Sequence, residues 1–251
     1  MKAAIIIPAR YASSRLPGKP LLKATGKFLI QHCYEQALLC ELANRVIVAT
    51  DDERIADAVR SFGGEVAMTR GDHVSGTDRI AEVAGGLDAE IIVNLQGDEP
   101  QFDPAALDLL IGFDAPMATL AVPIRDDATY RNPNVVKVVC DDGGRALYFS
   151  RSPIPMVRDD TPDFASGRFL QHLGVYAYRR DTLLSLARTP AHPLELAEKL
   201  EQLRALAHGI PIRVGVVRIG HRGIDTPEDY AEFVKAREMA EVGQRRTQLL
   251  S

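Results

Sequence analysis

A loop rich in cations follows the first apolar segment of the chain. Residues 3–7 are a run of alanine and isoleucine, and the loop after them carries Arg10, Arg15 and Lys19 among small residues. In a parallel sheet, ligands bind beyond the carboxyl ends of the strands. Backbone N–H groups and three cations at that edge could hold a triphosphate. The loop lacks the glycines of a Walker A or dinucleotide-binding loop, so its spacing alone fits a solvated basic loop equally well.

A carboxylate follows an apolar segment in the middle of the chain. Residues 91–95 have the pattern of a buried strand, and Gln96-Gly97-Asp98 comes directly after them. Mg²⁺ binds one or two protein carboxylates and completes its coordination with phosphate oxygens and water. Because Asp98 and the cationic loop are expected at the same edge of the sheet, the sequence favours a metal ligand over a cap on the helix predicted near Pro104.

Two further segments each fit two roles. Asp225 stands just before a helix predicted to begin at Pro227, so it is either an N-cap or a second Mg²⁺ ligand. The segment 75–77 (Ser-Gly-Thr) precedes another predicted helix. Its hydroxyl and N–H groups suit a nucleotide base or phosphate, and helix capping explains them equally well.

The elements that must position these residues follow from the pattern of apolar residues. In the first half, short apolar runs alternate with helix-period segments. Strands are predicted at 3–7, 45–50, 65–68 and 91–95, and helices at 30–39, 53–59 and 77–84. This alternation is typical of an α/β protein, in which helices cover both faces of a mostly parallel sheet.

The second half is richer in strands. Strand patterns lie at 117–122, 135–139, 146–149, 174–178 and 212–217. An amphipathic helix is predicted over 194–207, and another opens at Pro227 with Thr226 as its cap. The polar, proline-containing segment 152–168 is expected to be a mobile or partner-covered loop.

Composition bounds the class of protein. The chain has 251 residues, 46% hydrophobic and 25% charged, which suits one globular α/β unit. A net charge of −4 argues against a nucleic-acid-binding protein. Cys33, Cys40 and Cys140 lack C-x-x-C spacing, so buried free thiols are favoured over a metal site. Apolar runs are too short for a signal peptide or a membrane span, so we expect a cytoplasmic protein that binds no membrane.

Nine segments, in order along almost the whole chain, resemble CMP-KDO synthetase, the cytidylyltransferase for the acid sugar 3-deoxy-manno-octulosonate (KDO). They are 10–21 (RYASSRLPGKPL), 72–79 (DHVSGTDR), 93–100 (VNLQGDEP), 132–139 (NPNVVKVV), 147–151 (LYFSR), 172–176 (HLGVY), 193–195 (PLE), 200–204 (LEQLR) and 223–229 (GIDTPED). The resemblance implies a nucleotide-diphospho-sugar transferase-like three-layer α/β fold, with a mostly parallel mixed sheet and a strand-rich sugar-binding and dimerisation portion. It implies Mg²⁺ dependence, a homodimer, CTP and KDO as substrates, and a role in making the inner core of lipopolysaccharide.

The resemblance also implies one domain over 1–251 and the roles of its residues. Residues 1–125 would mainly bind nucleotide, 126–220 would bind sugar and dimerise, and 221–251 would supply a metal aspartate and the C-terminal helix. Four residues match catalytic positions, the two aspartates as Mg²⁺ ligands: Arg15, Lys19, Asp98 and Asp225. The positions matched to nucleotide binding are Ala9, Arg10, Ser13, Arg15, Lys19, Ser75, Gly76, Thr77 and Arg79. Those matched to the sugar are Gln96, Arg158, His172, Tyr176, Glu201 and Gln202.

Departures from the family pattern lie near the sugar side. Residues 152–156 read Ser-Pro-Ile-Pro-Met where the family commonly has Ile-Pro-Trp, and the loop 157–168 is short. KDO and its 8-amino form therefore both stay open as substrates. Sialic acid is disfavoured because 12–15 reads Ala-Ser-Ser-Arg in place of Gly-Ser-Lys-Gly. A module that binds nucleotides without turnover would be expected to lose Lys19 or an aspartate, and this chain keeps them.

Overall fold

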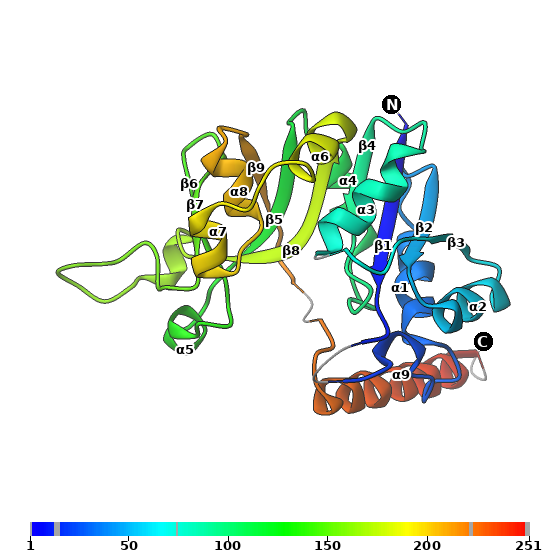
Figure 1. Cartoon of the computed structure of the whole chain (residues 1–251). Helices are drawn as coiled ribbons and strands as arrows, with labels where there is room; N and C mark the ends of the chain where they lie inside the picture. The colour runs from blue at the N-terminus through cyan, green and yellow to red at the C-terminus, as the bar shows by residue number, and fades with distance from the viewer. Residues whose placement is uncertain (1, 13–15, 74, 221–222, 249–251) are drawn as a thin grey trace.

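One mixed sheet runs through the molecule (Figure 1). The computed structural model describes residues 2–12, 16–73, 75–220 and 223–248. Within these ranges the strands are β1 (Ala3–Ala9), β2 (Arg45–Thr50), β3 (Glu65–Met68), β4 (Ile91–Asn94), β5 (Met117–Pro123), β6 (Lys137–Cys140), β7 (Ala146–Ser150), β8 (Leu170–Arg179) and β9 (Ile212–Val216). Their order is β3-β2-β1-β4-β8-β5-β9, and the hairpin β6–β7 joins β8 through β6.

The first half of the sheet is parallel, as the sequence predicts. β1 pairs in parallel with both β2 and β4, and β2 pairs in parallel with β3. β8 then runs antiparallel to β4 and β5, so one long strand joins the parallel part to the strand-rich part. The strand predicted at 174–178 is only the end of this longer β8.

Helices cover both faces because β1 is apolar on both sides. Ile5 and Ile7 pack toward α1 (Leu29–Ala37), α2 (Glu53–Ser61) and α4 (Pro104–Ile111). Ala4 and Ile6, on the alternate positions, pack toward α3 (Gly76–Gly85), α6 (Arg180–Leu186) and α8 (Gln202–Ala207). The three-layer α/β fold expected from the sequence is therefore confirmed.

The last helix crosses beneath the edge of the parallel strands (Figure 1). Helix α9 (Pro227–Gln248) begins with Thr226 accepting a hydrogen bond from the Asp229 backbone N–H, as predicted for its cap. Its Phe233 and the preceding Ile224 form a small core with Leu29 of α1. This packing brings the segment around Asp225 under the loop that follows β1.

The prediction of one helix over 194–207 is wrong. Helix α7 (Pro193–Glu198) ends at Lys199, whose φ of 54° and ψ of 48° are left-handed, and α8 begins at Gln202. The short helix α5 (Asp127–Arg131) and the 3₁₀ turns η1 (Lys19–Leu21) and η2 (Phe164–Ser166) complete the described elements. No helix in the described part of the chain is long and apolar enough to cross a membrane.

Candidate active site

Two carboxylates from distant segments meet one ammonium at the edge of the sheet. Lys19 Nζ lies 2.6 Å from Asp98 Oδ2 and 3.3 Å from Asp225 Oδ1, and it also donates to the Ile224 carbonyl at 2.8 Å. The Ile224 N–H in turn donates to the Asp98 carbonyl at 2.8 Å. The structure thus brings together three of the four predicted catalytic residues, and the fourth, Arg15, lies outside the described residues.

Local contacts explain why Asp98 faces this edge. A Cβ on Gly97 would lie only 3.1 Å from the Pro8 carbonyl oxygen, so glycine lets the loop after β4 approach β1. Asp103, rather than Asp98, caps α4 by accepting from the Ala105 N–H. Burial, and then the charge of Asp98, raise the pKa of the neighbouring Glu99 to about 8, so Glu99 adds little negative charge at neutral pH.

These carboxylates fit a hard divalent cation. Asp98 and Asp225 remain partly exposed, with 25% and 45% of their side chains accessible, and they converge on one positive group. Mg²⁺ commonly takes only one or two protein carboxylates and leaves its other positions to phosphate and water. Neither at this site nor elsewhere among the described residues do three or more His, Cys, Asp or Glu side chains form a cluster that could hold a metal ion.

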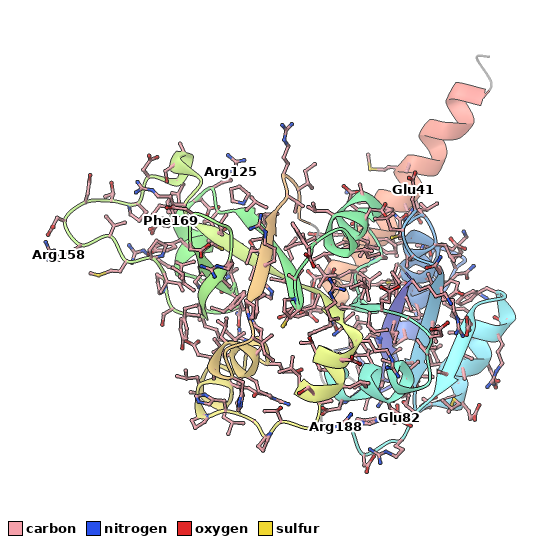
Figure 2. The ribbon with its side chains drawn as sticks, turned by 90° about the horizontal axis from the view of Figure 1, so that it is seen from above. Glu41, Glu82, Arg125, Arg158, Phe169 and Arg188 are labelled. Atoms are coloured by element: carbon pink, nitrogen blue, oxygen red, sulfur yellow. The ribbon has the colours of Figure 1, made fainter. Side chains whose placement is uncertain are left out.

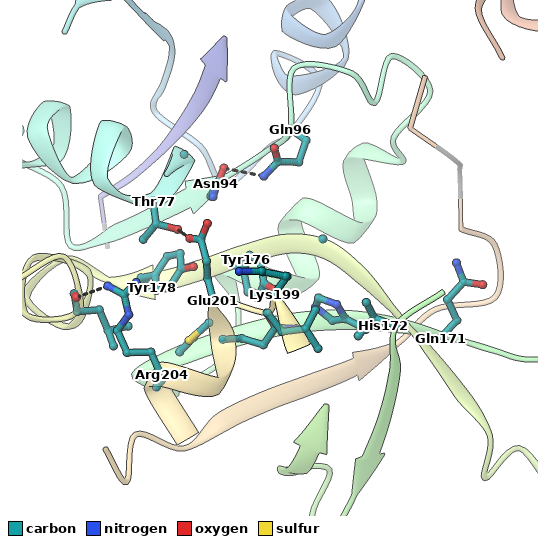
Figure 3. A pocket seen from close by; sticks show the side chains of 18 of the residues that line it. Thr77, Asn94, Gln96, Gln171, His172, Tyr176, Tyr178, Lys199, Glu201 and Arg204 are labelled. Carbon is teal, nitrogen blue, oxygen red and sulfur yellow. Dashed lines mark hydrogen bonds between the residues drawn. The ribbon is translucent and has the colours of Figure 1, made fainter. Parts of the chain in front are cut away.

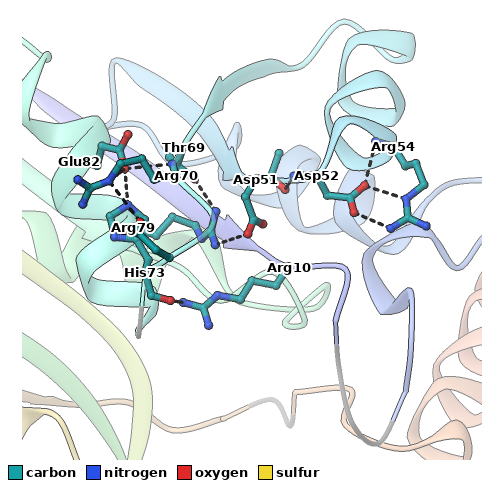
Figure 4. A network of polar contacts seen from close by, with 11 residues as sticks. Arg10, Asp51, Asp52, Arg54, Thr69, Arg70, His73, Arg79 and Glu82 are labelled. Carbon is teal, nitrogen blue, oxygen red and sulfur yellow. Dashed lines mark hydrogen bonds and ion pairs between the residues drawn. The ribbon is translucent and has the colours of Figure 1, made fainter.

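The loop before α3 lies near Arg10, which follows β1 (Figure 4). Ser75 caps α3 in a reciprocal capping box with Asp78, so its hydroxyl is engaged in the free protein. Arg10 donates to the His73 carbonyl at 2.8 Å and thereby ties the cationic loop to this segment. Ala9 is a buried end of β1, and Ser13 lies outside the described residues.

Arg79 does not reach the surface of this site. Its side chain is fully buried, with Nη2 3.1 Å from Asp51 Oδ2 and Nη1 donating to the Thr69 hydroxyl (Figure 4). Asp51 follows β2 and Thr69 follows β3, so the guanidinium joins the ends of two strands to α3. Arg79 thereby supports the loop that begins at residue 70, and its contact with a nucleotide stays a prediction.

We expect Arg79→Met to lower the free energy of unfolding by about 2 kcal/mol or more, because a buried ion pair would lose one partner. In the variant that still folds, the KM for CTP, the nucleotide that the resemblance implies, should change little. Thermal melts and steady-state kinetics measure the two effects. Arg70→Met is the matched control: the Arg70 side chain is 70% exposed, and losing its exposed ion pairs with Asp72 and Glu82 should cost less than about 1 kcal/mol. An unchanged Tm together with a raised KM for CTP would restore Arg79 as a ligand-binding residue.

A cavity of about 360 Å³, in the range of small-molecule sites, lies between the end of β4, β8 and the helix break at Lys199 (Figure 3). Five of the six predicted sugar residues line it: Gln96, His172, Tyr176, Glu201 and Gln202. Gly76 and Thr77 from the start of α3 line it as well. Gln96 lies two positions before Asp98, so one loop contributes to both the cavity and the carboxylate site.

His172 is held as a neutral group in the cavity wall. Burial lowers its pKa to about 3. The Thr119 hydroxyl has one proton, which it donates to the Val175 carbonyl at 2.7 Å, so it accepts from His172 Nε2 at 2.9 Å. Nδ1 is then the unprotonated nitrogen and can accept a hydrogen bond from a ligand hydroxyl.

The helix break aims Glu201 and Gln202 at the cavity. The Glu198 carboxylate accepts from the Ser150 hydroxyl at 2.6 Å and from the Arg151 N–H at 2.9 Å, and Arg151 Nε donates to the Glu198 carbonyl at 2.8 Å. This clamp ends α7. After the break, Glu201 Oε2 accepts from the Thr77 hydroxyl at 2.6 Å across the cavity, and the buried Gln202 Nε2 has no partner among the described residues.

Arg158 is the predicted sugar residue that the structure does not bring to the cavity. It lies on the long loop that projects from the strand-rich part (Figure 2). Its side chain is 83% exposed and pairs with the adjacent Asp159 at 3.0 Å. The segment between β7 and β8 is held to the fold by Val157 and Phe164, which pack against the cluster of Tyr130 and Phe169, while Arg158 itself stays exposed.

Sequence reasoning missed three polar residues that shape this cavity. Asn94 and Thr119 each interrupt an apolar strand, and a buried polar residue in such a run is the signal that could have found them. Asn94 accepts a weak hydrogen bond from Gln96 at 3.4 Å, and Thr119 fixes the His172 ring. Lys199 lines the cavity from the helix break, which no local pattern indicates.

We expect the free energy of unfolding to fall on acidification because of His172. Its pKa of about 3 in the fold lies below the value of about 6.5 for an unfolded histidine, so the unfolded chain binds the proton first. Stability is therefore lost as pH falls below about 6.5, by about 2 kcal/mol from His172 between pH 7 and pH 5. Urea unfolding at both pH values should show this loss. In the His172→Gln variant, the part of the pH dependence that comes from His172 should be absent. An equal slope in the variant would contradict the neutral His172.

Sequence and structure are both similar to those of known proteins. It matches the profile of the cytidylyltransferase family over residues 4–214. The chain belongs to the cytidylyltransferase family. A relative from Geobacter metallireducens, a 3-deoxy-manno-octulosonate cytidylyltransferase, is 52% identical over 247 residues, which cover 94% of this chain and 97% of the relative. The resemblance to CMP-KDO synthetase drawn from the sequence is thereby confirmed.

Solved structures of cytidylyltransferases agree with the fold. A CMP:2-keto-3-deoxy-manno-octonic acid synthetase complexed with CTP is 47% identical and superimposes with a TM-score of 0.87, covering 97% of this chain and 100% of that one. The 4-diphosphocytidyl-2C-methyl-D-erythritol synthase of Anaerococcus prevotii is 16% identical, with a TM-score of 0.62 over 95% of this chain and 96% of that one. The second likeness shows the fold alone.

Proposed function

We propose that this cytidylyltransferase transfers CMP from CTP to the anomeric hydroxyl of KDO and releases pyrophosphate. The observation that carries the proposal is the 47% identical synthetase for this sugar, which superimposes over 97% of the chain and is complexed with CTP. The cavity and the Lys19–aspartate edge share the loop of Gln96 and Asp98, which suits a reaction that joins a sugar to a nucleotide.

The cationic edge suits the departure of pyrophosphate. The anomeric oxygen forms a bond to the α-phosphorus of CTP while the bond from that phosphorus to the bridging oxygen of pyrophosphate breaks. Such transfers rely on positioning and on neutralising charge. Lys19 would act as a point charge on the leaving group, and Arg15 as a forked donor.

Asp98 and Asp225 would hold Mg²⁺. When bound, this ion would lower the pKa of the attacking hydroxyl and neutralise phosphate charge. The residues themselves would orient both substrates, and Lys19 would turn from the two carboxylates toward the phosphates. We name no side chain as the base; neutral His172 would accept a hydrogen bond from a sugar hydroxyl through Nδ1.

The nucleotide half of the proposal includes recognition of cytosine near 75–77. Sites that hydrogen-bond to a base discriminate strongly, because a wrong base leaves buried polar groups unpaired. For the sugar, 8-amino-KDO is the alternative to KDO, because residues 152–168 depart from the family pattern.

A pyrophosphate-release assay tests both halves. CTP, ATP and GTP are each combined with Mg²⁺ and with KDO, 8-amino-KDO or sialic acid. We expect release with CTP and KDO and little with the purine nucleotides or sialic acid. Equal release with the three nucleotides would overturn the cytidine specificity, and release only with 8-amino-KDO would change the sugar.

A cytoplasmic homodimer is also part of the proposal. The strand-rich half exposes several large apolar side chains, among them Leu147 of β7, Val216 of β9 and Ile219. Because contiguous exposed apolar patches commonly mark an interface, we propose that these side chains contribute to one. Light scattering at micromolar concentration should give a dimer, and a fully active monomer would contradict it.

A further inference from the structure

Few of the residues in the cavity wall carry the positive charge that would bind an acid. Three charged residues line it among those that the structure describes: Lys199, Glu201 and Arg204. Glu201 is acidic and cannot bind a carboxylate as a cation would, and His172 adds no positive charge because burial lowers its pKa to about 3. A carboxylate that enters this cavity therefore needs a cation from Lys199 or Arg204.

Arg204 is already engaged. Its Nε and Nη2 donate to the two oxygens of Glu195 at 2.8 and 2.5 Å, in a forked pair of which both side chains are largely buried. Its Nη1 donates to the carbonyls of Leu186 and Thr189 at 3.2 and 3.1 Å. Arg204 thus has a structural role at the base of the cavity.

Lys199 is the cationic side chain of the cavity wall that is available to bind a ligand. It forms no ion pair with any carboxylate among the described residues, and its side chain reaches into the cavity beside Tyr176 (Figure 3). The backbone at Lys199 is left-handed, a conformation for which helix ends normally use glycine or asparagine. The clamp between Glu198 and Arg151 holds this conformation and so directs the Lys199 side chain.

We propose that Lys199 binds the carboxylate of the acid sugar and is a specificity-determining residue for it. The inference rests on the proposed function for the identity of the sugar. Arg158, which the resemblance matches to sugar binding, lies instead on the projecting loop. An ammonium on a flexible stem can follow the carboxylate as the sugar settles between Gln96 and Tyr176.

Three substitutions at residue 199 separate charge from backbone effects. Lys199→Met keeps the length of the side chain and removes the charge, Lys199→Arg keeps the charge, and Lys199→Gly relieves the left-handed conformation. We expect Met and Gly to raise the KM for KDO by about tenfold or more with the KM for CTP nearly unchanged, because a charge-assisted hydrogen bond is lost. Arg should stay within about threefold of the wild type. The Tm of Lys199→Gly should equal or exceed that of the wild type, which shows that lost binding is not lost folding.

A direct comparison of ligands isolates the carboxylate. Calorimetry measures the Kd of KDO and of its neutral C1 amide for the wild type and for Lys199→Met. We expect the wild type to prefer the acid and Lys199→Met to lose most of that preference. If Lys199→Met keeps the full preference, the inference is overturned even when the wild type makes CMP-KDO. If the wild type releases no pyrophosphate, the proposed function fails, and the same binding comparison still decides the role of Lys199.

Discussion

Replacing Asp98 or Asp225 with asparagine should lower turnover by on the order of a hundredfold or more while the fold persists, the scale of losing preorganised charge stabilisation. The substitution keeps the size of the side chain and removes the charge that the two residues direct at one point, now occupied by Lys19 Nζ. Single-turnover kinetics with saturating CTP and KDO measure the loss, and a thermal melt follows folding.

Matched controls separate this effect from helix capping. Asp103→Ala and Thr226→Ala remove the true caps of α4 and α9, which lie near the two aspartates. Each control should cost about 1 kcal/mol of stability and leave turnover near normal. If Asp225→Asn behaves like these controls while Asp98→Asn is inactive, the site uses one protein carboxylate and the two-aspartate proposal is wrong.

Lys19→Met should lower turnover by about a hundredfold, more than it raises the KM for CTP, because the ammonium acts most on the departing pyrophosphate. In the free protein Lys19 also lies between two carboxylates, so its loss leaves like charges facing each other. The melting temperature of the variant should therefore rise more on addition of Mg²⁺ than that of the wild type.

Lys23→Met is the control for the lysine substitution. Lys23 lies four positions along the chain, with its Nζ 4.4 Å from the centre of the Phe28 ring and no carboxylate partner among the described residues. Its replacement should leave turnover and the Mg²⁺ response unchanged. A Lys19→Met variant with full turnover and only a raised KM for CTP would make Lys19 a simple binding residue. Arg15→Ala is expected to show the same split as Lys19→Met.

The sequence by itself determined the parallel half of the sheet and most helix ends. The run from Ala3 and the run Arg45–Thr50 are apolar on both faces, so they can only be strands covered by two helical layers. Helix caps can be predicted from neighbouring residues, because the cap side chain accepts a hydrogen bond from a backbone N–H two or three residues later. This is the case for Asp52, Ser75 and Thr226. Long motifs in order also identified the family.

Only the tertiary structure decided which candidate residues meet. A continuous helix over 194–207 satisfies every local rule, but Glu198 binds Ser150 and Arg151, residues almost fifty positions away, and the helix ends there. Arg79 likewise resembles a ligand-binding residue in its motif, and its burial depends on Asp51 and Thr69 at the ends of two other strands. Lys19 meets Asp225 across 206 positions because α9 packs against α1. Periodicity and capping report on neighbours along the chain, whereas these contacts follow from how the layers pack.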